Sequence, residues 1–177
     1  PGALSRQGEV DRVRDILIHY YSRIYAIQPP GTLDGGDICE AGGHFFIGVS
    51  QRTNEAGALQ LAEILAGEGY TSELIDIRRT PGILHLKSGI AYLGDRQLAV
   101  IQALANHPAF REYELFELPL GEEYAANCVL VNEYVLMAAG YPRFQKILVE
   151  AGHRLILLEM SEYQKMDGGL SCLSLRF

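Results

Sequence analysis

Three segments far apart in the sequence carry side chains that could form one nucleophilic site. Cys172 lies near the C-terminus in DGGLSC, where two glycines precede an apolar run that we expect to be a short strand. The thiolate is the reactive form of cysteine, and it needs a base or a cation nearby. His85, in LHLKS, and Asp34, in TLDGGD, could supply that base and a carboxylate to orient it. Together they predict nucleophilic catalysis by Cys172.

Each of these residues also has a more ordinary explanation. A free cysteine is among the most buried residue types, so Cys172 could be a core thiol. His85 alternates with leucines and could simply pack in a strand, although its intrinsic pKa suits proton transfer near neutrality. Asp34 and Asp37 flank two glycines, as a tight turn requires. We assign Asp37 and the glycines to the turn and Asp34 to the site, where its carboxylate could hold His85 or bind a cationic substrate.

The composition indicates an ordinary globular protein. The 177 residues are 48% hydrophobic and 21% charged, which favours a single domain over 1–177. The formal charge is −7 without a lysine and arginine cluster, so nucleic acid and an anionic membrane surface are poor partners. An acidic surface is compatible with a small cationic substrate. A homo-oligomer remains an open option.

Cysteine usage and hydropathy indicate the cellular compartment and the kinds of site that the sequence favours. Three widely spaced cysteines, without a CxxC pair or an HxxxH motif, predict neither a disulfide framework nor a zinc site, and we expect no cofactor. A reducing compartment, the cytoplasm, fits this usage best. The sequence has no apolar run of about 18 residues and no visible signal peptide. It starts at Pro1 with its first motif, as expected of a portion of a longer chain.

A strand–strand–helix–strand pattern recurs along the chain about every 40 to 50 residues. The expected elements are a helix over 6–21, strands over 22–27, 38–40 and 44–49, a helix over 54–69, strands over 73–77, 84–93 and 97–101, a short helix, strands over 112–118, 127–131 and 134–137, a helix over 143–151 and a strand over 154–159. Repeated α/β units of this kind stack around an axis as a propeller or a solenoid. Asp34, His85 and Cys172 each lie at the opening strand of a unit, so radial packing would bring them to one end of the axis.

Two arginines could hold an anionic group. Arg6 and Arg52 each lie at or just before an expected helix start. Arginines in such places are most often solvated, but a guanidinium also pairs bidentately with a carboxylate. Cys39 and Cys128 lie in apolar strands, and we expect both to be core residues.

The motifs together resemble the dimethylarginine dimethylaminohydrolases of the guanidine-modifying amidinotransferase superfamily. The matching stretches are PGALSR at 1–6, TLDGGD at 32–37, FFIGVSQRTN at 45–54, LHLKS at 84–88, AANC at 125–128 and the segment 160–172. The resemblance implies a pentein-type α/β propeller of five ββαβ modules. About three modules are present here, because the family's chain has an N-terminal portion before Pro1. The chain would then be the C-terminal part of the propeller.

The resemblance also implies roles for seven residues. Cys172 would be the nucleophile, His85 the acid and base, and Asp34 the acidic member. The remaining four would bind the substrate: Arg6 and Arg52 at its carboxylate end, and Met166 and Asp167 elsewhere along it.

The implied reaction is hydrolysis of methylated arginine to citrulline and a methylamine through a thiouronium on Cys172. Related arginine deiminases and amidinotransferases carry an aspartate two residues after the histidine, where this chain has Lys87. That difference favours the dimethylaminohydrolase branch. The alternatives are one of those two activities, or a non-catalytic fragment that binds guanidino ligands.

Overall fold

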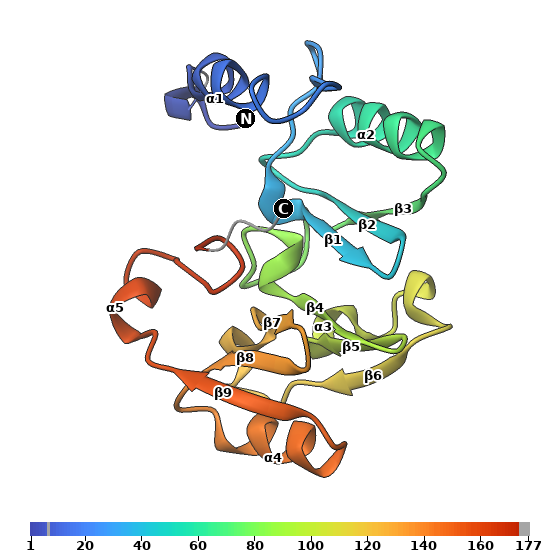
Figure 1. Cartoon of the computed structure of the whole chain (residues 1–177). Helices are drawn as coiled ribbons and strands as arrows, with labels where there is room; N and C mark the ends of the chain where they lie inside the picture. Colours follow the sequence, from blue (N-terminus) through green and yellow to red (C-terminus); the bar gives the residue numbers. More distant parts are fainter. Residues whose placement is uncertain (7, 174–177) are drawn as a thin grey trace.

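The computed structural model describes residues 1–6 and 8–173, which contain three consecutive ββαβ units (Figure 1). The units are β1 (Ile38–Ala41), β2 (His44–Val49), α2 (Glu55–Gly67) and β3 (Thr71–Asp76); β4 (Ile90–Gly94), β5 (Gln97–Val100), α3 (Gln102–Ala105) and β6 (Glu114–Glu117); and β7 (Val129–Val131), β8 (Tyr134–Ala138), α4 (Pro142–Glu150) and β9 (Arg154–Leu158). In each unit the first two strands are antiparallel, and the third returns parallel to the second. Each unit is therefore a separate three-stranded sheet.

Local sequence explains the first unit. Gly42 and Gly43 turn the hairpin with φ of +66° and +88°, values that L side chains rarely adopt. The resulting register pairs Ile38 with Ile47. Asn54 begins α2, because its Oδ1 accepts a 2.8 Å hydrogen bond from the Gly57 N–H. The expected hairpin and helix of this unit are confirmed.

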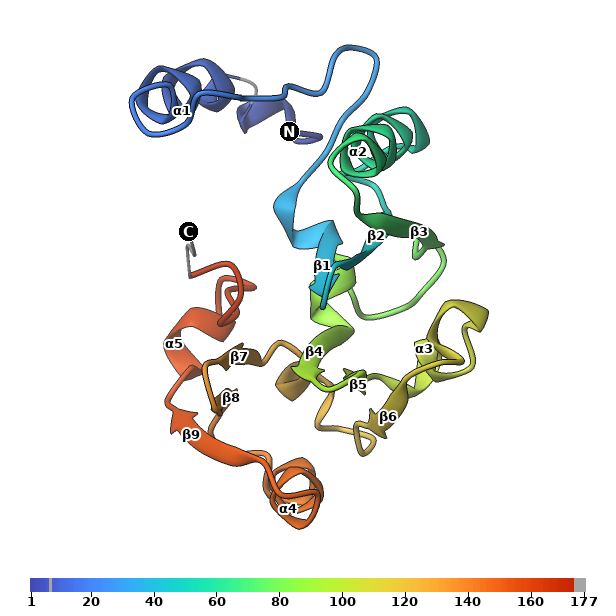
Figure 2. The same cartoon turned by 45° about the vertical axis from the view of Figure 1, so that its right-hand side comes forward.

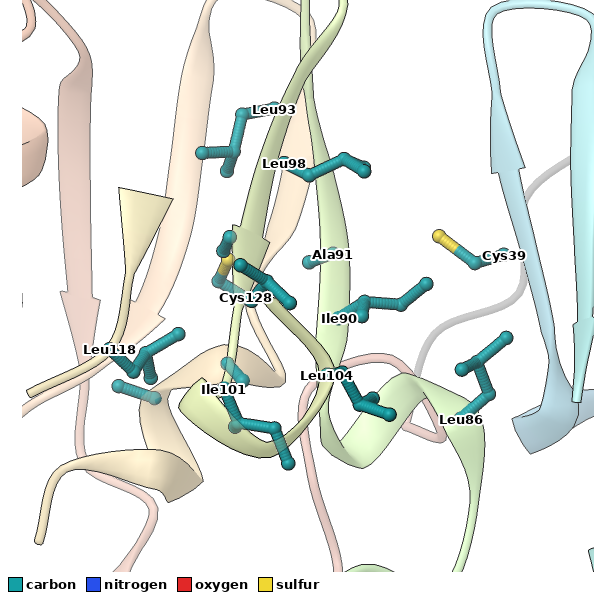
Figure 3. Packing of buried hydrophobic residues seen from close by; sticks show 14 of the residues in the cluster. Cys39, Leu86, Ile90, Ala91, Leu93, Leu98, Ile101, Leu104, Leu118 and Cys128 are labelled. Atoms are coloured by element: carbon teal, nitrogen blue, oxygen red, sulfur yellow. The ribbon is translucent and has the colours of Figure 1, made fainter. Parts of the chain in front are cut away.

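The three sheets lie side by side, with their first strands innermost (Figure 2). Strand β1 contacts β4, and β4 contacts β7. The main core fills this inner region: Cys39, Ile90, Ala91 and Cys128 share one buried cluster (Figure 3). The expected α/β propeller architecture is confirmed, and Cys39 and Cys128 are core residues at 4% and 3% exposure.

Short 3-10 turns precede the inner strands. They are η2 (Gly35–Asp37) before β1, η3 (Leu86–Ser88) before β4 and η5 (Glu123–Ala126) before β7; two further 3-10 turns, η1 (Leu4–Arg6) and η4 (Pro108–Phe110), lie elsewhere. Turn η2 contacts η3, and η3 contacts η5. The three turns therefore form a continuous row at one end of the units.

The expected strand over 84–93 is wrong in its first half. Only Ile90–Gly94 forms a strand, because the Leu86 N–H donates to the carboxylate of Asp37 and the Gly89 N–H donates to the Leu86 carbonyl. These bonds close η3 and leave His85 just before it.

The chain on either side of the three units differs more from expectation. Helix α1 (Glu9–Leu17) is shorter than the expected 6–21, and the segment 22–27 forms no strand. No residue of α1 is buried, and Figure 2 shows this helix standing apart from the sheets.

At the other end, α5 (Ser161–Gln164) is followed by a turn over 170–173. The expected strand at Cys172 is therefore wrong over the described residues, and its last part, 174–177, lies outside them. Within the described part of the chain, no helix combines the length and apolar character needed to span a membrane.

Candidate active site

His85 stands beside a buried carboxylate. Its Nδ1 lies 3.4 Å from Oδ2 of Asp37, which is within ion-pair range but too long for a hydrogen bond, and Nδ1 has no other hydrogen-bond partner among the described residues. The His85 side chain is 23% exposed, whereas that of Asp37 is fully buried. A carboxylate at Nδ1 orients an imidazole ring and favours the proton on that nitrogen. The other ring nitrogen, Nε2, can then exchange a proton with a ligand.

Three hydrogen-bond donors hold the Asp37 carboxylate. The hydroxyls of Ser50 and Thr53 donate to Oδ2 over 2.8 and 2.7 Å, and the Leu86 N–H donates to Oδ1 over 3.0 Å. Burial by itself would raise the pKa of Asp37, but the interaction with His85 and these three hydrogen bonds outweigh it and lower the pKa. Asp37 is therefore an anion at neutral pH.

Two glycines make room for this pair. A Cβ on Gly36 would lie 2.6 Å from Cγ of His85, so the ring packs directly on the Gly36 backbone. A Cβ on Gly48 would lie 2.8 Å from Cβ of Leu86 and 3.2 Å from Oδ1 of Asp37. Gly36 therefore serves close approach of the histidine, beyond the turn role assigned to it from sequence.

Asp34 has a different partner from the one predicted. Its Oδ2 lies 3.3 Å from Nη1 of Arg6, and its backbone N–H donates to the Thr53 hydroxyl. The carboxylate that holds His85 is that of Asp37, so assigning this task to Asp34 was wrong. The physical reason is the geometry of η2: Asp37, at its end, lies against η3, whereas Asp34 lies at the N-cap of η2. A role for Asp34 toward a substrate cation stays a prediction.

Cys172 lies in the turn after α5. Its side chain is exposed, and Sγ lies 3.1 Å from both the backbone nitrogen and the carbonyl oxygen of Gly169. Burial raises the pKa of Cys39 to about 11 and that of Cys128 to about 12. Of the three cysteines, all within the described residues, Cys172 is therefore the accessible thiol.

Asn127 connects the turn of Cys172 with the segment of His85. Its Oδ1 accepts from the Ser171 N–H over 2.8 Å, and its Nδ2 donates to the Lys87 carbonyl over 3.0 Å. Sequence reasoning missed this residue. The available signal was its place in the AANC stretch, between turn η5 and β7.

The four predicted substrate-binding residues lie on three separate segments. Arg6 is half-exposed and also pairs with Glu9, over 2.9 Å. Arg52 is half-buried, with its backbone against Gly2. Met166 is 85% exposed, and Asp167 has a φ of +55° in the loop before Gly168.

Two open hollows flank the site. A groove of about 760 Å³ runs between α1 and the segment 24–35, and Arg6 and Asp34 line it. A second hollow, of about 640 Å³, lies along the inner strands and reaches Lys87 and Ser171. Among the described residues, no cluster of three or more His, Cys, Asp and Glu side chains could hold a metal ion.

The fold and the site define a class of protein: a pentein-type α/β propeller with a histidine–carboxylate pair and an exposed cysteine on neighbouring turns. A dimethylarginine dimethylaminohydrolase from Pseudomonas aeruginosa is 42% identical over 178 residues, which cover all of this chain and 69% of the relative. The chain belongs to the dimethylarginine dimethylaminohydrolase family. It spans about two thirds of that relative's length. No family model matches the chain.

Solved structures agree with this assignment. A mutant of the Pseudomonas aeruginosa protein complexed with citrulline superposes with a TM-score of 0.92 at 42% identity, covering 100% of this chain and 69% of that one. A dimethylarginine dimethylaminohydrolase adduct with S-methyl-L-thiocitrulline gives the same TM-score, identity and coverage.

Proposed function

We propose that this protein hydrolyses Nω-methylated arginines to citrulline and a methylamine, with Cys172 as the nucleophile. The observation that carries the proposal is the contact between His85 and the ionised Asp37 in a chain of this family. Such a pair can donate and then accept a proton at Nε2, as both halves of a covalent hydrolysis require.

In the first half, the Cys172 thiolate attacks the guanidinium carbon, and the bond from sulfur to carbon forms. The bond from that carbon to the methylated nitrogen then breaks. His85, as an imidazolium held by Asp37, gives its Nε2 proton to the departing amine. A thiouronium on Cys172 and a neutral His85 remain.

In the second half, His85 takes a proton from water at Nε2 while the water oxygen bonds to the thiouronium carbon. The bond from carbon to sulfur breaks, and the Cys172 thiolate returns. The second proton of the water leaves the new hydroxyl group as the citrulline carbonyl forms, and it passes through solvent to the methylamine, which is released as its ammonium ion. Citrulline leaves, and the net reaction consumes one water for each methylamine released. Asp37 stabilises the imidazolium that forms again at this step.

The remaining residues bind the substrate in this proposal. Arg6 and Arg52 hold its carboxylate as guanidinium–carboxylate pairs. Asp34 carries negative charge beside the groove and attracts the substrate's cationic end, while Met166 and Asp167 contact the substrate from the loop after α5. We place the protein in the reducing setting of the cytoplasm, which suits three free thiols.

The test is turnover of asymmetric dimethylarginine, with citrulline and dimethylamine measured separately. Equal amounts of both products are expected from the wild-type chain, and none from Cys172→Ser. Cys39→Ala is the matched control, because it removes a buried thiol and should keep turnover. Release of ammonia from arginine instead would identify a deiminase, and transfer of the amidino group to an added amine would identify an amidinotransferase.

Because the chain spans about two thirds of its relative, the assay has two arms. One uses the chain alone, and the other adds the part of the Pseudomonas relative that lies outside the matched residues. Turnover in either arm that depends on Cys172 supports the proposal. If dimethylarginine binds in both arms but is not turned over in either, the proposed hydrolysis is wrong and the protein is a guanidino-binding protein.

A further inference from the structure

Asn127 makes two hydrogen bonds of opposite sense to two different segments. Its carbonyl oxygen accepts from the Ser171 N–H, next to Cys172, over 2.8 Å. Its amide nitrogen donates to the Lys87 carbonyl, two residues after His85, over 3.0 Å. The two segments lie far apart in sequence, so one side chain fixes their relative placement.

The turn of Cys172 is shaped to receive this amide. A Cβ on Gly169 would lie between 2.6 and 2.8 Å from the side-chain atoms of Asn127, so the absence of a side chain there permits the approach. Tyr124 lies in η5, the turn just before Asn127, and its hydroxyl donates to the Gly168 carbonyl over 2.6 Å. Turn η5 and its C-cap residue Asn127 therefore hold the segment of Cys172 at two points.

The chemistry of the contacts requires a group that donates and accepts at once. An amide does both, whereas a carboxylate only accepts and would face the Lys87 carbonyl with a second negative oxygen. A protonated carboxylic acid again offers one donor and one acceptor. An aspartate at this position would therefore reproduce the native pair of bonds only when it is protonated.

We propose that Asn127 is a positioning residue that sets the Cys172 turn relative to the His85 segment and thereby aligns the nucleophile with its acid and base. The proposal rests on the hydrolysis proposed above. Asn127 need not touch the substrate, so its loss should lower kcat while KM changes little. Small misplacements of reacting groups cost about 100-fold in rate.

The decisive variant is Asn127→Asp, assayed with dimethylarginine in parallel with wild type at pH 8 and pH 5.5. We expect kcat about 100-fold below wild type at pH 8, with KM within about threefold. At pH 5.5 the ratio of variant to wild-type kcat should rise about threefold or more, because a few per cent of the carboxyl groups, or more, are then protonated. Asn127→Ala, which cannot regain a donor, should show the same loss at both pH values.

Asn106→Asp is the matched control, since it makes the same chemical change just after α3, away from the described site contacts, and should keep wild-type kcat at both pH values. Wild-type kcat in Asn127→Asp at pH 8, or a ratio that stays constant with pH while the variant remains folded, would overturn the proposal. If Asn127→Ala does not fold, Asn127→Asp still tests the proposal, because its relative kcat at pH 8 is compared with its relative kcat at pH 5.5 in the same protein.

A second measurement separates this proposal from the proposed function. If wild type turns over no dimethylarginine, the function fails, and hydrogen exchange then decides the positioning role. Faster exchange over 169–173 in Asn127→Asp than in wild type at pH 8, with a smaller difference at pH 5.5, supports the contact. Unchanged exchange at both pH values overturns it.

Discussion

Nδ1 of His85 lies 3.4 Å from Oδ2 of Asp37, and this contact joins the first ββαβ unit to the second at the start of their inner strands. Asp37 comes from η2, and His85 lies at the N-cap of η3. The same carboxylate also binds the Leu86 backbone, so it fixes both the ring and the main chain that carries it. One side chain therefore both faces the candidate base and holds together the turns that precede β1 and β4.

Gly36 should be sensitive to a single added methyl group. Gly36→Ala places a Cβ 2.6 Å from the His85 ring, so the ring must move away from its position over η2. We expect kcat to fall about 100-fold from this misplacement. The measurement is steady-state turnover, with a thermal melt to confirm folding. Gly35→Ala is the matched control, because a Cβ there meets nothing within 4 Å, and equal losses in both variants would contradict the account.

Replacing Asp37 should cost both activity and stability. Asp37→Asn turns one acceptor oxygen into a donor that faces hydroxyls or the imidazole, and we expect a loss of about 3 kcal/mol in the free energy of unfolding. The kcat should fall further than the unfolded fraction explains, because His85 loses its anionic partner. Urea unfolding and turnover assays measure the two effects.

Glu122 provides the control for this comparison. It is also a buried carboxylate, and it accepts from the Phe144 N–H over 2.8 Å and pairs with Arg143 at the start of α4. Glu122→Gln should lower stability through that helix end while leaving kcat unchanged. Similar loss of kcat in both variants would argue against a specific role for Asp37.

The pH dependence of stability has a definite sign. The pKa of Asp37 is lowered in the folded protein, so its contribution is complete well above the ordinary aspartate value of 3.8 and is lost as the pH falls through the folded value. The unfolding free energies of wild type and Asp37→Asn should therefore converge as the pH is lowered from 5 toward and below that value. A difference that grows on acidification would contradict this account.

The three thiols should differ strongly toward alkylation. Cys39 and Cys128 are buried with raised pKa values, so their thiolate fraction at pH 7.5 is about three in ten thousand or less. Exposed Cys172 should therefore react first with iodoacetamide, and an arginine analogue should change its rate alone. Peptide mass spectrometry after short labelling measures this, and preferential labelling of Cys39 or Cys128 in the folded protein would refute the assignment.

Sequence periodicity was sufficient for the repeated units, because inner strands such as β1 and β4 are short, apolar and bounded by glycine turns. It failed where tertiary contacts decide local structure. His85 looked like part of a strand, but the hydrogen bond from Leu86 to Asp37 closes η3 instead. The segment 22–27 has strand-forming residues yet forms no strand.

Tertiary contacts also decide which of Asp34 and Asp37 faces His85, and the sequence does not show them. Both flank Gly35 and Gly36, and the spacing alone cannot tell which carboxylate turns inward. The hairpin register offered a signal, since pairing of Ile38 with Ile47 places Asp37 next to Gly48 and close to Ser50. The hydrogen-bond partners of Asn127 were out of reach, because they are 40 and 44 residues away in sequence.

The central claim, covalent catalysis by Cys172, is tested most directly by trapping the intermediate. In His85→Gly the water of the second half-reaction lacks its base, so an adduct should accumulate with S-methyl-L-thiocitrulline. Acid quenching and peptide mass spectrometry locate it. We expect a modification on Cys172 that is absent from the double variant with Cys172→Ser. Modification of Cys39 or Cys128 instead, or citrulline formation by Cys172→Ser at the wild-type rate, would contradict it.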